Sequence, residues 1–238
     1  MTSFKLLSYN VWFESLKLVE RMRAIGEIIA AHSPDIITVQ EVQRDILACF
    51  QAAEWYKQYT VTRLPFYESY FTLIFSKGPI RQFSQSALMR SIMGRDLKVV
   101  EVTMAGRSCV FATAHLESPV GPWQGGPPDQ FSSVRALQLA QVLGTLGGLS
   151  CPNVFFSGDT NWIARDGAMD LSPGWTDAWP TLRPGEVSME MICTMHACCC
   201  CGDCYDSLGV VLLTISPLVA REHIRREAQQ NAYIEYQQ

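Results

Sequence analysis

The alternation of strand-like and helix-like segments between Phe4 and Pro184 restricts the fold more than any other property of this sequence. The strand-like segments are short and rich in β-branched and aromatic residues, and turn signals separate them from segments with apolar residues at helical spacing. The strand-like segments are residues 4–9, 36–42, 67–76, 97–104, 108–115 and 154–156. Strands that alternate with helices in this way predict a layered α/β domain.

Three segments within this region are expected to be helices. The first has an apolar stripe at intervals of three to four residues, formed by Leu18, Met22, Ile25 and Ile29. Ser15 is its expected N-cap, and Ser33-Pro34 is expected to end it. The other two helices are expected over residues 43–53 and 128–146.

The charge balance limits the classes of partner. The 238 residues include 19 Lys and Arg against 23 Asp and Glu, which leaves a net charge of −4. A protein that coats nucleic acid through bulk electrostatics carries a positive excess, so the balance argues against that class. An enzyme that holds one strand in a local groove is compatible with this balance. With 48% hydrophobic and 18% charged residues, the chain can bury a large core.

Neither a membrane span nor a secretory signal is expected. The most apolar stretch, residues 208–220, contains Ser216 and Pro217 and is shorter than the roughly 20 residues that a spanning helix needs. The first 184 residues hold three widely spaced cysteines, which are Cys49, Cys109 and Cys151. This spacing indicates no disulfide framework and favours a reducing, intracellular compartment.

Polar side chains stand where four of the expected strands end. These residues are Asn10, Gln40-Glu41, His115 with Glu117, and Asp159 with Asn161. In layered α/β folds, the strand ends that face a crevice are where sites are assembled. The four strand ends are therefore the candidate functional site.

The residue types at these ends suit a metal-assisted hydrolase. The carboxylate of Glu41 and the amide oxygen of Asn10 are hard ligands of the kind that Mg²⁺ prefers. Asp159 can orient or activate a water, and Asn161 can donate to a phosphate oxygen. His115 can hydrogen-bond a phosphate or orient a neighbouring acid. Together these groups indicate metal-assisted hydrolysis of a phosphodiester or a phosphomonoester.

Each residue alone has a plainer interpretation. An asparagine or a Gly-Asp pair at a strand end is commonly a turn former, and Gln-Glu after a strand is commonly solvated. A lone histidine is commonly a satisfied core residue. The hypothesis of a site therefore depends on the combined order of these residues along the chain.

That order resembles the endonuclease/exonuclease/phosphatase superfamily, and within it the 5′-tyrosyl-DNA phosphodiesterase branch. The matching motifs are Leu7-Ser8-Tyr9-Asn10, Pro34-Asp35-Ile36-Ile37, Val39-Gln40-Glu41-Val42, Ser69-Tyr70-Phe71-Thr72, Ala114-His115-Leu116-Glu117-Ser118, Phe156-Ser157-Gly158-Asp159-Thr160-Asn161 and Asp177-Ala178-Trp179. The resemblance runs from about Phe4 to about Pro184. His-Leu-Glu-Ser followed by Gly-Asp-Thr-Asn is what favours the tyrosyl-DNA branch.

The resemblance implies a four-layered α/β/β/α sandwich and a metal-dependent phosphodiesterase that uses Mg²⁺, with Mn²⁺ as an alternative. It implies that Glu41 binds the metal directly. It also implies that Asn10 lies nearby, where it contacts the metal, a metal-bound water or the phosphate. It further implies that Asp159 positions the attacking water and that Asn161 binds the scissile phosphate.

The resemblance also implies how the substrate is held. His115 and Ser118 would line the phosphate pocket. Tyr70 matches an aromatic residue in the family's narrow DNA groove, where a single-stranded 5′ end can stack with little sequence preference. The implied reaction is hydrolysis of the bond between a tyrosine oxygen and a 5′ DNA phosphate, in the repair of topoisomerase–DNA adducts.

The chain departs from the family pattern toward its C-terminal end. Family members have closing strands that carry an acidic metal-site residue and a Ser-Asp-His, and no Ser-Asp-His occurs in this sequence. Ile163 stands two positions after Asn161, where the family has an arginine. We therefore expect an incomplete family domain over residues 1–184, with its C-terminal strands missing or replaced.

Residues 185–238 differ in composition from the rest of the chain. They carry six of the nine cysteines and no lysine. Cys193-x-x-His196 and Cys201-x-x-Cys204 have zinc-compatible spacing within each pair, but only four residues separate the pairs. A zinc site at these four residues and an unstructured tail are the two alternatives, and a helix over residues 220–238 is expected to close the chain.

Three functions stay open from the sequence. The first is a nuclear phosphodiesterase, also compatible with the cytoplasm, that acts as a monomer on DNA 5′ ends carrying a tyrosyl or peptide adduct. The second is another activity of the superfamily, such as an abasic-site nuclease or a sugar or lipid phosphatase, against which His-Leu-Glu-Ser and Tyr70 count. The third is a catalytically impaired or inactive relative that binds DNA ends or a partner, which the absence of Ser-Asp-His favours.

Overall fold

The computed structural model of the chain describes residues 3–64, 70–104, 106–119, 131–162, 166–178 and 233–237. Its elements in chain order are β1 (Ser3–Asn10), α1 (Leu18–His32), β2 (Ile36–Val42), α2 (Arg44–Ala52), the 3-10 helix η1 (Glu54–Gln58), β3 (Thr60–Val61), β4 (Phe71–Ser76), β5 (Ile80–Ala87), β6 (Asp96–Met104), β7 (Arg107–Ala114), α3 (Ser132–Gly147), β8 (Val154–Phe156) and β9 (Tyr233–Gln237).

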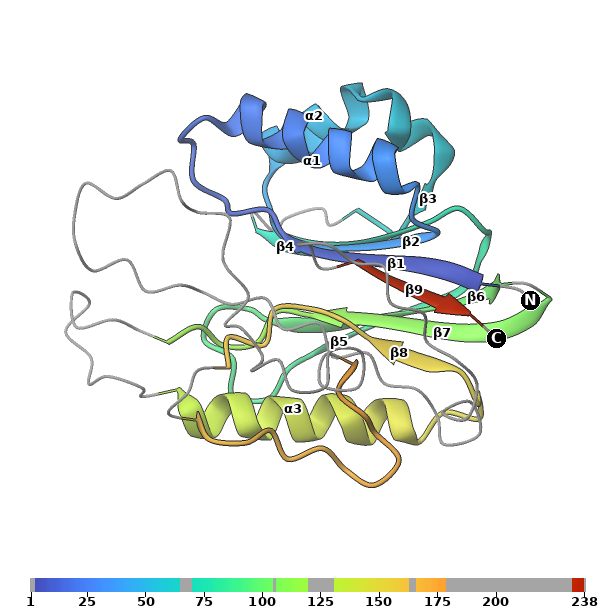
Figure 1. Cartoon of the computed structure of the whole chain (residues 1–238). Coiled ribbons are helices and arrows are strands. Elements are labelled where there is room, and N and C mark those ends of the chain that lie inside the picture. The colour runs from blue at the N-terminus through green and yellow to red at the C-terminus, as the bar shows by residue number, and fades with distance from the viewer. Residues whose placement is uncertain are drawn as a thin grey trace.

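The strands form two sheets that lie face to face. One sheet has the order β3-β4-β2-β1-β9 and the other has the order β5-β6-β7-β8. Figure 1 shows α1 and α2 on the outer face of the first sheet and α3 on the outer face of the second. The expected four-layered α/β/β/α sandwich is therefore confirmed. Within the described ranges, no helix has the length and apolar character that crossing a membrane requires.

Apolar side chains fill each of the three spaces between the layers. The apolar stripe predicted for α1 packs on the first sheet, and Leu139 and Val142 of α3 pack on the second. Between the sheets, the ring of Phe4 stands edge-on to Phe111 and Phe155, with ring centroids 5.3 and 5.0 Å apart. Burying a side chain of this size stabilises the fold by roughly 1.5–3 kcal/mol, so these layers hold the sandwich closed.

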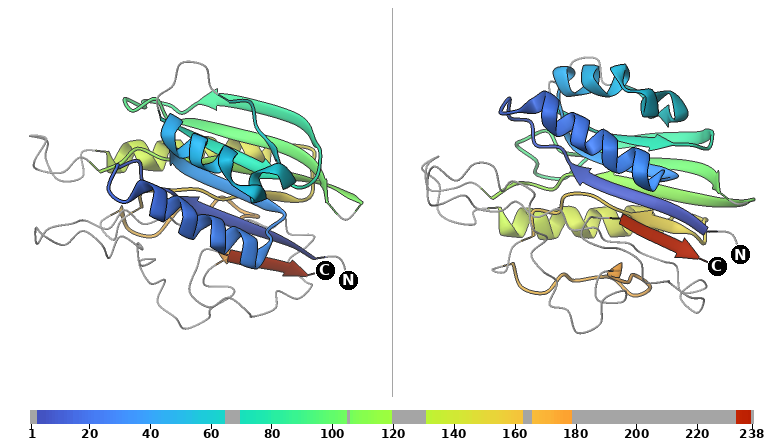
Figure 2. Two further views of the ribbon diagram at one scale, coloured as in Figure 1. Left: turned by 90° about the horizontal axis from the view of Figure 1, so that it is seen from above. Right: turned by 45° about the horizontal axis from the view of Figure 1, so that its top comes forward.

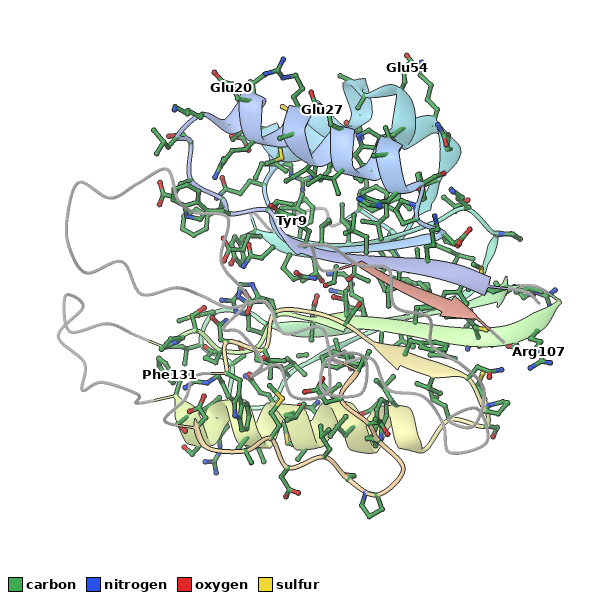
Figure 3. All side chains as sticks on the ribbon, in the orientation of Figure 1. Tyr9, Glu20, Glu27, Glu54, Arg107 and Phe131 are labelled. Atoms are coloured by element: carbon green, nitrogen blue, oxygen red, sulfur yellow. The ribbon has the colours of Figure 1, made fainter. Side chains whose placement is uncertain are left out.

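The pairing of the strands brings the four polar strand ends to one end of the sandwich. β1 and β2 pair in parallel, with Asn10 opposite Gln40, and β7 and β8 pair in parallel, with Ala112 opposite Phe156. Parallel neighbours have their carboxyl ends on the same side. Figure 3 shows Arg107, the first residue of β7, at the opposite end of the sandwich from Phe131, which precedes α3.

The start of α1 and the strand β5 differ from the sequence predictions. α1 begins at Leu18 rather than near Ser15, because Lys17 takes a left-handed conformation and caps the helix without a side-chain hydrogen bond. Ser33 is also left-handed and ends α1, as predicted. β5 was missed because it is an edge strand with mostly exposed, polar side chains, so it shows no apolar alternation.

The C-terminal helix predicted over residues 220–238 is wrong at residues 233–237. These residues form β9, which pairs antiparallel with β1, so that Ser3 lies opposite Gln237. Tyrosine and isoleucine favour extended backbone, and this preference outweighs the polar character of the segment. Both views in Figure 2 show β9 beside β1 with the two ends of the chain close together. Residues 220–232 lie outside the described residues.

Candidate active site

Side chains from both sheets meet in one buried cluster. The Asn10 amide, at the end of β1, donates through Nδ2 to Glu41 Oε1 (3.0 Å) and to Asp159 Oδ2 (2.6 Å). His115 Nε2 lies 3.4 Å from Asp159 Oδ2 and 3.9 Å from Glu41 Oε1. Glu41, His115 and Asp159 are all buried, and the Asp159 residue is 0% exposed. The structure thus places two carboxylates and an imidazole in direct proximity.

A local irregularity in β2 turns Glu41 into this cluster. The register between β2 and β4 shifts between Val39 and Val42, and Glu41 has a φ of 64°. A left-handed conformation costs a non-glycine residue on the order of 1–3 kcal/mol. Glu41 Oε2 accepts the N–H of Phe13 (3.1 Å), so partners hold both carboxylate oxygens. The strained backbone therefore aims and fixes a buried carboxylate.

Asp159 reaches the cluster through a close approach between the ends of β7 and β8. A Cβ atom on Gly158 would overlap the carbonyl oxygen of Ala114, so only glycine allows this approach. The Asp159 N–H donates to that carbonyl (3.1 Å), and the Asp159 carbonyl accepts the N–H of Leu116 (2.8 Å). Burial raises the pKa of Asp159 to about 6, although the hydrogen bonds that it accepts act in the opposite direction.

Asn161 and Ser118 connect Asp159 to the neighbouring loop. The Asn161 N–H donates to Asp159 Oδ1 (2.9 Å) from a residue with a φ of 49°. Asn161 Nδ2 donates to the carbonyl of Leu116 (2.9 Å) and to Ser118 Oγ (3.2 Å). Both amide hydrogens are thus engaged, and the phosphate contact expected for Asn161 requires one of them to be released.

The hydrogen bonds of His115 define its tautomer. Arg95 Nη1 lies 2.8 Å from His115 Nδ1, and a guanidinium can only donate, so Nδ1 accepts and the proton is on Nε2. Burial and the charge of Arg95 lower the pKa of His115 well below its usual range, so the ring is neutral. Nε2 is buried and has no hydrogen-bond partner among the described residues. This N–H faces the two carboxylates and is available to an incoming anion.

Arg95 is a site residue that the sequence analysis missed. It precedes β6, is buried, and donates through Nη2 to Ser118 Oγ (2.8 Å). Its guanidinium carbon lies 5.1 Å from the centroid of the Tyr70 ring. A single arginine before a strand carries no motif, so no signal in the sequence distinguishes it. It brings a positive charge beside the two carboxylates.

Tyr70 and Phe13 form an aromatic rim beside the cluster. The Tyr70 Oη lies 3.2 Å from His115 Nδ1, and the Tyr70 ring stands edge-on to the ring of Phe13, with centroids 5.6 Å apart. Phe13 is 39% exposed. The rim therefore offers solvent an aromatic surface that leads to the imidazole.

Glu117 holds the loop that carries Arg95. Its buried carboxylate accepts the N–H groups of Ile92 (2.9 Å) and Met93 (3.0 Å) through Oε1. Through Oε2 it accepts Ser91 Oγ (2.8 Å) and Gln138 Nε2 (3.2 Å). Glu117 stands at one of the four polar strand ends, and its contacts show that it positions this loop.

We expect Glu117→Gln to lower the free energy of unfolding by about 2–4 kcal/mol, because one amide group cannot accept all four of these hydrogen bonds. Thermal or urea denaturation measures the change. The exposed Glu27→Gln on α1, whose side chain points away from the sheet in Figure 3, is the matched control and should be neutral. Equal stability of both variants would show that the loop is held by other contacts.

The donor set of the cluster fits a divalent cation. Glu41, His115 and Asp159 each offer one potential ligand atom, and these atoms lie within 4.8 Å of one another. Because the proton of His115 is on Nε2, the imidazole suits an anion, and the carboxylates of Glu41 and Asp159 are the groups that would hold a cation. Hard carboxylate oxygens favour Mg²⁺, Ca²⁺ or Mn²⁺ over softer metals.

The structure brings together all the candidate residues that it describes. These residues are Asn10, Glu41, Tyr70, His115, Ser118, Asp159 and Asn161. The orientation of Asn10 differs from the expected metal ligand, because its Oδ1 accepts the N–H of Trp12 (2.9 Å) and its Nδ2 faces the carboxylates. The zinc candidates Cys193, His196, Cys201 and Cys204 lie outside the described residues.

The sequence matches a protein family and several known proteins. The model of the Endonuclease/Exonuclease/phosphatase family matches residues 7–189. Tyrosyl-DNA phosphodiesterase 2 of Gallus gallus is 31% identical over 191 residues, covering 76% of this chain and 48% of that protein. The Mus musculus protein of the same name is 30% identical over 164 residues, covering 65% and 41%. The chain thus spans about half the length of the curated relatives it matches.

Solved structures show the same fold. The crystal structure of humanized D. rerio TDP2 has a TM-score of 0.67 at 24% sequence identity and covers 78% of this chain and 74% of that one. D. rerio TDP2 complexed with single strand DNA product has a TM-score of 0.66 at 23% identity and covers 78% and 72%. The chain belongs to the endonuclease/exonuclease/phosphatase family, and among the members of that family it is similar to tyrosyl-DNA phosphodiesterase 2.

Proposed function

We propose that the chain is a Mg²⁺-dependent phosphodiesterase that hydrolyses the bond between a tyrosine oxygen and a 5′ DNA phosphate. The observation that carries the proposal is the buried cluster in which Glu41 and Asp159 face the unpartnered Nε2 of His115. Relatives named tyrosyl-DNA phosphodiesterase 2, and a structural neighbour complexed with single strand DNA product, support this substrate class. Mn²⁺ is the alternative metal, since it also accepts carboxylate oxygens.

The residues of the cluster divide the chemistry among them. A divalent cation held at Glu41 would supply Lewis-acid stabilisation of the charge on the phosphate. Asp159 orients the attacking water and accepts its proton, a task suited to a pKa of about 6. His115 donates from Nε2 to a non-bridging phosphate oxygen, and Arg95 holds that tautomer and adds positive charge beside it.

The aromatic rim supports a DNA substrate with a flexible end. Tyr70, backed by Phe13, offers a ring face on which a single-stranded 5′ end can stack without sequence preference. We further propose that the chain acts as a monomer in the nucleus, on DNA 5′ ends left by topoisomerases in DNA repair.

Cleavage of a 5′-phosphotyrosyl oligonucleotide tests this proposal. We expect release of tyrosine with Mg²⁺, no release with a chelator, and none by Glu41→Gln. Because the family's Ser-Asp-His is absent from this sequence, the rate should be about 10²–10³ lower than that of a family member that carries it. The exposed Glu27→Gln should cleave like the unmodified chain.

Two parallel substrates separate the proposal from its alternatives. An abasic-site duplex and an inositol phosphate should remain intact under the same conditions. Faster cleavage of either would assign the site to another activity of the family. No cleavage of any substrate by folded protein would leave a binding-only relative, and a DNA-binding titration would then follow.

A further inference from the structure

The turn between β1 and α1 delivers two backbone N–H groups to the site. The N–H of Trp12 donates to Asn10 Oδ1 (2.9 Å), and the N–H of Phe13 donates to Glu41 Oε2 (3.1 Å). The first bond turns the Asn10 amide so that Nδ2 faces both carboxylates. The second fixes the outer oxygen of Glu41. The orientation of both side chains therefore depends on where this turn lies.

The turn needs support from outside its own backbone. Trp12 is left-handed, with a φ of 54°, which a non-glycine residue adopts only at a cost. The N–H of Val11 donates to the carbonyl of Gln40 (3.0 Å), before the turn, while residues 13–17 are exposed. A strained and exposed segment of this kind keeps one geometry only if other side chains hold it.

Arg21, one turn into α1, supplies that support. Its Nη2 donates to the carbonyls of Trp12 (3.1 Å) and Glu14, and its guanidinium carbon lies 4.5 Å from the centroid of the Trp12 ring. One side chain thus grips the turn at two backbone carbonyls and at one aromatic face. A guanidinium combines these contacts in a single plane, which an ammonium group cannot do.

The remaining nitrogens of Arg21 show that this grip has a cost. Nε and Nη1 are buried and have no hydrogen-bond partner among the described residues. Burial lowers the pKa of Arg21, and the charges of Glu14 and Glu41 act in the opposite direction. A buried donor without a partner costs about 1–3 kcal/mol. The position of Arg21 therefore leaves some of its own hydrogen-bonding capacity unused while it holds the turn.

We propose that Arg21 is a positioning residue for the metal site, which holds the Trp12–Glu14 turn so that its N–H groups orient Asn10 and Glu41. The proposal rests on the proposed function, because it assumes that Glu41 holds a divalent cation. Arg21 lies outside the motifs by which the sequence resembles its family, and it acts on the cation only through other residues.

Binding of Mn²⁺, followed through the electron paramagnetic resonance signal of the free ion, tests this without catalysis. Arg21→Met keeps an apolar stem but removes both carbonyl contacts, and we expect it to weaken Mn²⁺ binding about 10- to 100-fold. Arg21→Lys should recover part of the loss, since it keeps the charge and one donor. Arg23→Ala, which removes an exposed arginine two residues along the same helix, should bind like the unmodified chain.

Kinetics on the 5′-phosphotyrosyl oligonucleotide add a second readout. At a fixed Mg²⁺ concentration, Arg21→Met should lower kcat about 10- to 100-fold and change KM less, because Tyr70 lies outside the Trp12–Glu14 turn and keeps its contact with His115. Excess Mg²⁺ should restore part of kcat. Unchanged Mn²⁺ affinity of a folded Arg21→Met, or equal losses in Arg23→Ala, would overturn the proposal.

The two readouts separate this proposal from the proposed function. If the unmodified chain binds Mn²⁺ but does not cleave the oligonucleotide, the proposed substrate is wrong and the Mn²⁺ comparison alone decides the role of Arg21. If the unmodified chain binds neither Mn²⁺ nor Mg²⁺, both proposals fail.

Discussion

The Glu41→Gln variant is expected to lose metal-dependent cleavage of the 5′-phosphotyrosyl oligonucleotide, with kcat at least about 1000-fold lower at saturating Mg²⁺. The reason is local. Glutamine replaces one charged carboxylate oxygen with an amide NH₂, which removes the negative charge that a hard cation requires. Its remaining oxygen can still accept the N–H of Phe13, so the β2 irregularity and the fold should persist. A thousandfold loss corresponds to about 4 kcal/mol of transition-state stabilisation.

Thermal denaturation with and without Mg²⁺ supplies an independent check. A cation that binds the folded chain alone raises its melting temperature, and the rise grows with concentration. We expect this rise in the unmodified chain and in the exposed control Glu27→Gln, and we expect none in Glu41→Gln. A Mg²⁺-dependent rise that survives in Glu41→Gln would place the cation elsewhere.

The Asp159→Asn variant is expected to be inactive and, without metal, more stable than the unmodified chain. Removing a general base typically costs about 10²–10⁴ in rate, so kcat should fall about 1000-fold. Stability should rise because the Asp159 residue is 0% exposed and its carboxylate has a second carboxylate, Glu41, nearby. Asparagine has a similar shape and no charge to desolvate.

The raised pKa of Asp159 determines how the free energy of unfolding changes with pH. The pKa of Asp159 is about 6 in the folded chain, above its ordinary value of 3.8, so the folded state binds the proton more tightly than the unfolded state. The stabilisation is therefore complete below about pH 4 and is lost as the pH rises through about 6. At pH 7.5 the metal-free chain should be less stable than Asp159→Asn by up to about 3 kcal/mol.

Urea denaturation in a chelating buffer at pH 4.5, 6 and 7.5 measures this difference. The gap between the two proteins should widen as the pH rises, and added Mg²⁺ should narrow it, because a cation beside two carboxylates stabilises the unmodified chain more than Asp159→Asn. A gap that is independent of pH would mean that Asp159 does not change its protonation state over this range, which would contradict a pKa of about 6.

The sequence predictions that the structure confirms were based on the spacing of apolar residues and on the polar residues at strand ends. The apolar stripe of α1 is visible in the sequence because it repeats with the helical period. The convergence of Asn10 with Glu41, and of His115 with Asp159, follows from parallel pairing, which places the carboxyl ends of neighbouring strands together. Both predictions depend on short-range patterns along the chain.

The features that sequence could not reveal depend on contacts between distant segments. Arg95 enters the site from the loop before β6, and its contact with His115 joins residues that no local pattern links. The left-handed Glu41 sits in a run that reads as an uninterrupted strand, because no glycine or asparagine marks the irregularity. In the sequence, Arg21 cannot be distinguished from any other polar residue on an amphipathic helix.

The pairing of β1 with β9 also sets the order in which the first sheet can be completed. β2 joins one edge of β1 from about thirty residues away, but the other edge is covered by Tyr233–Gln237. During synthesis, β9 cannot pair with that edge until residues 233–237 have been made, and an open strand edge is a template for pairing with other chains. A chain without residues 233–237 would therefore expose the free edge of β1, and we expect it to aggregate more readily than the full chain.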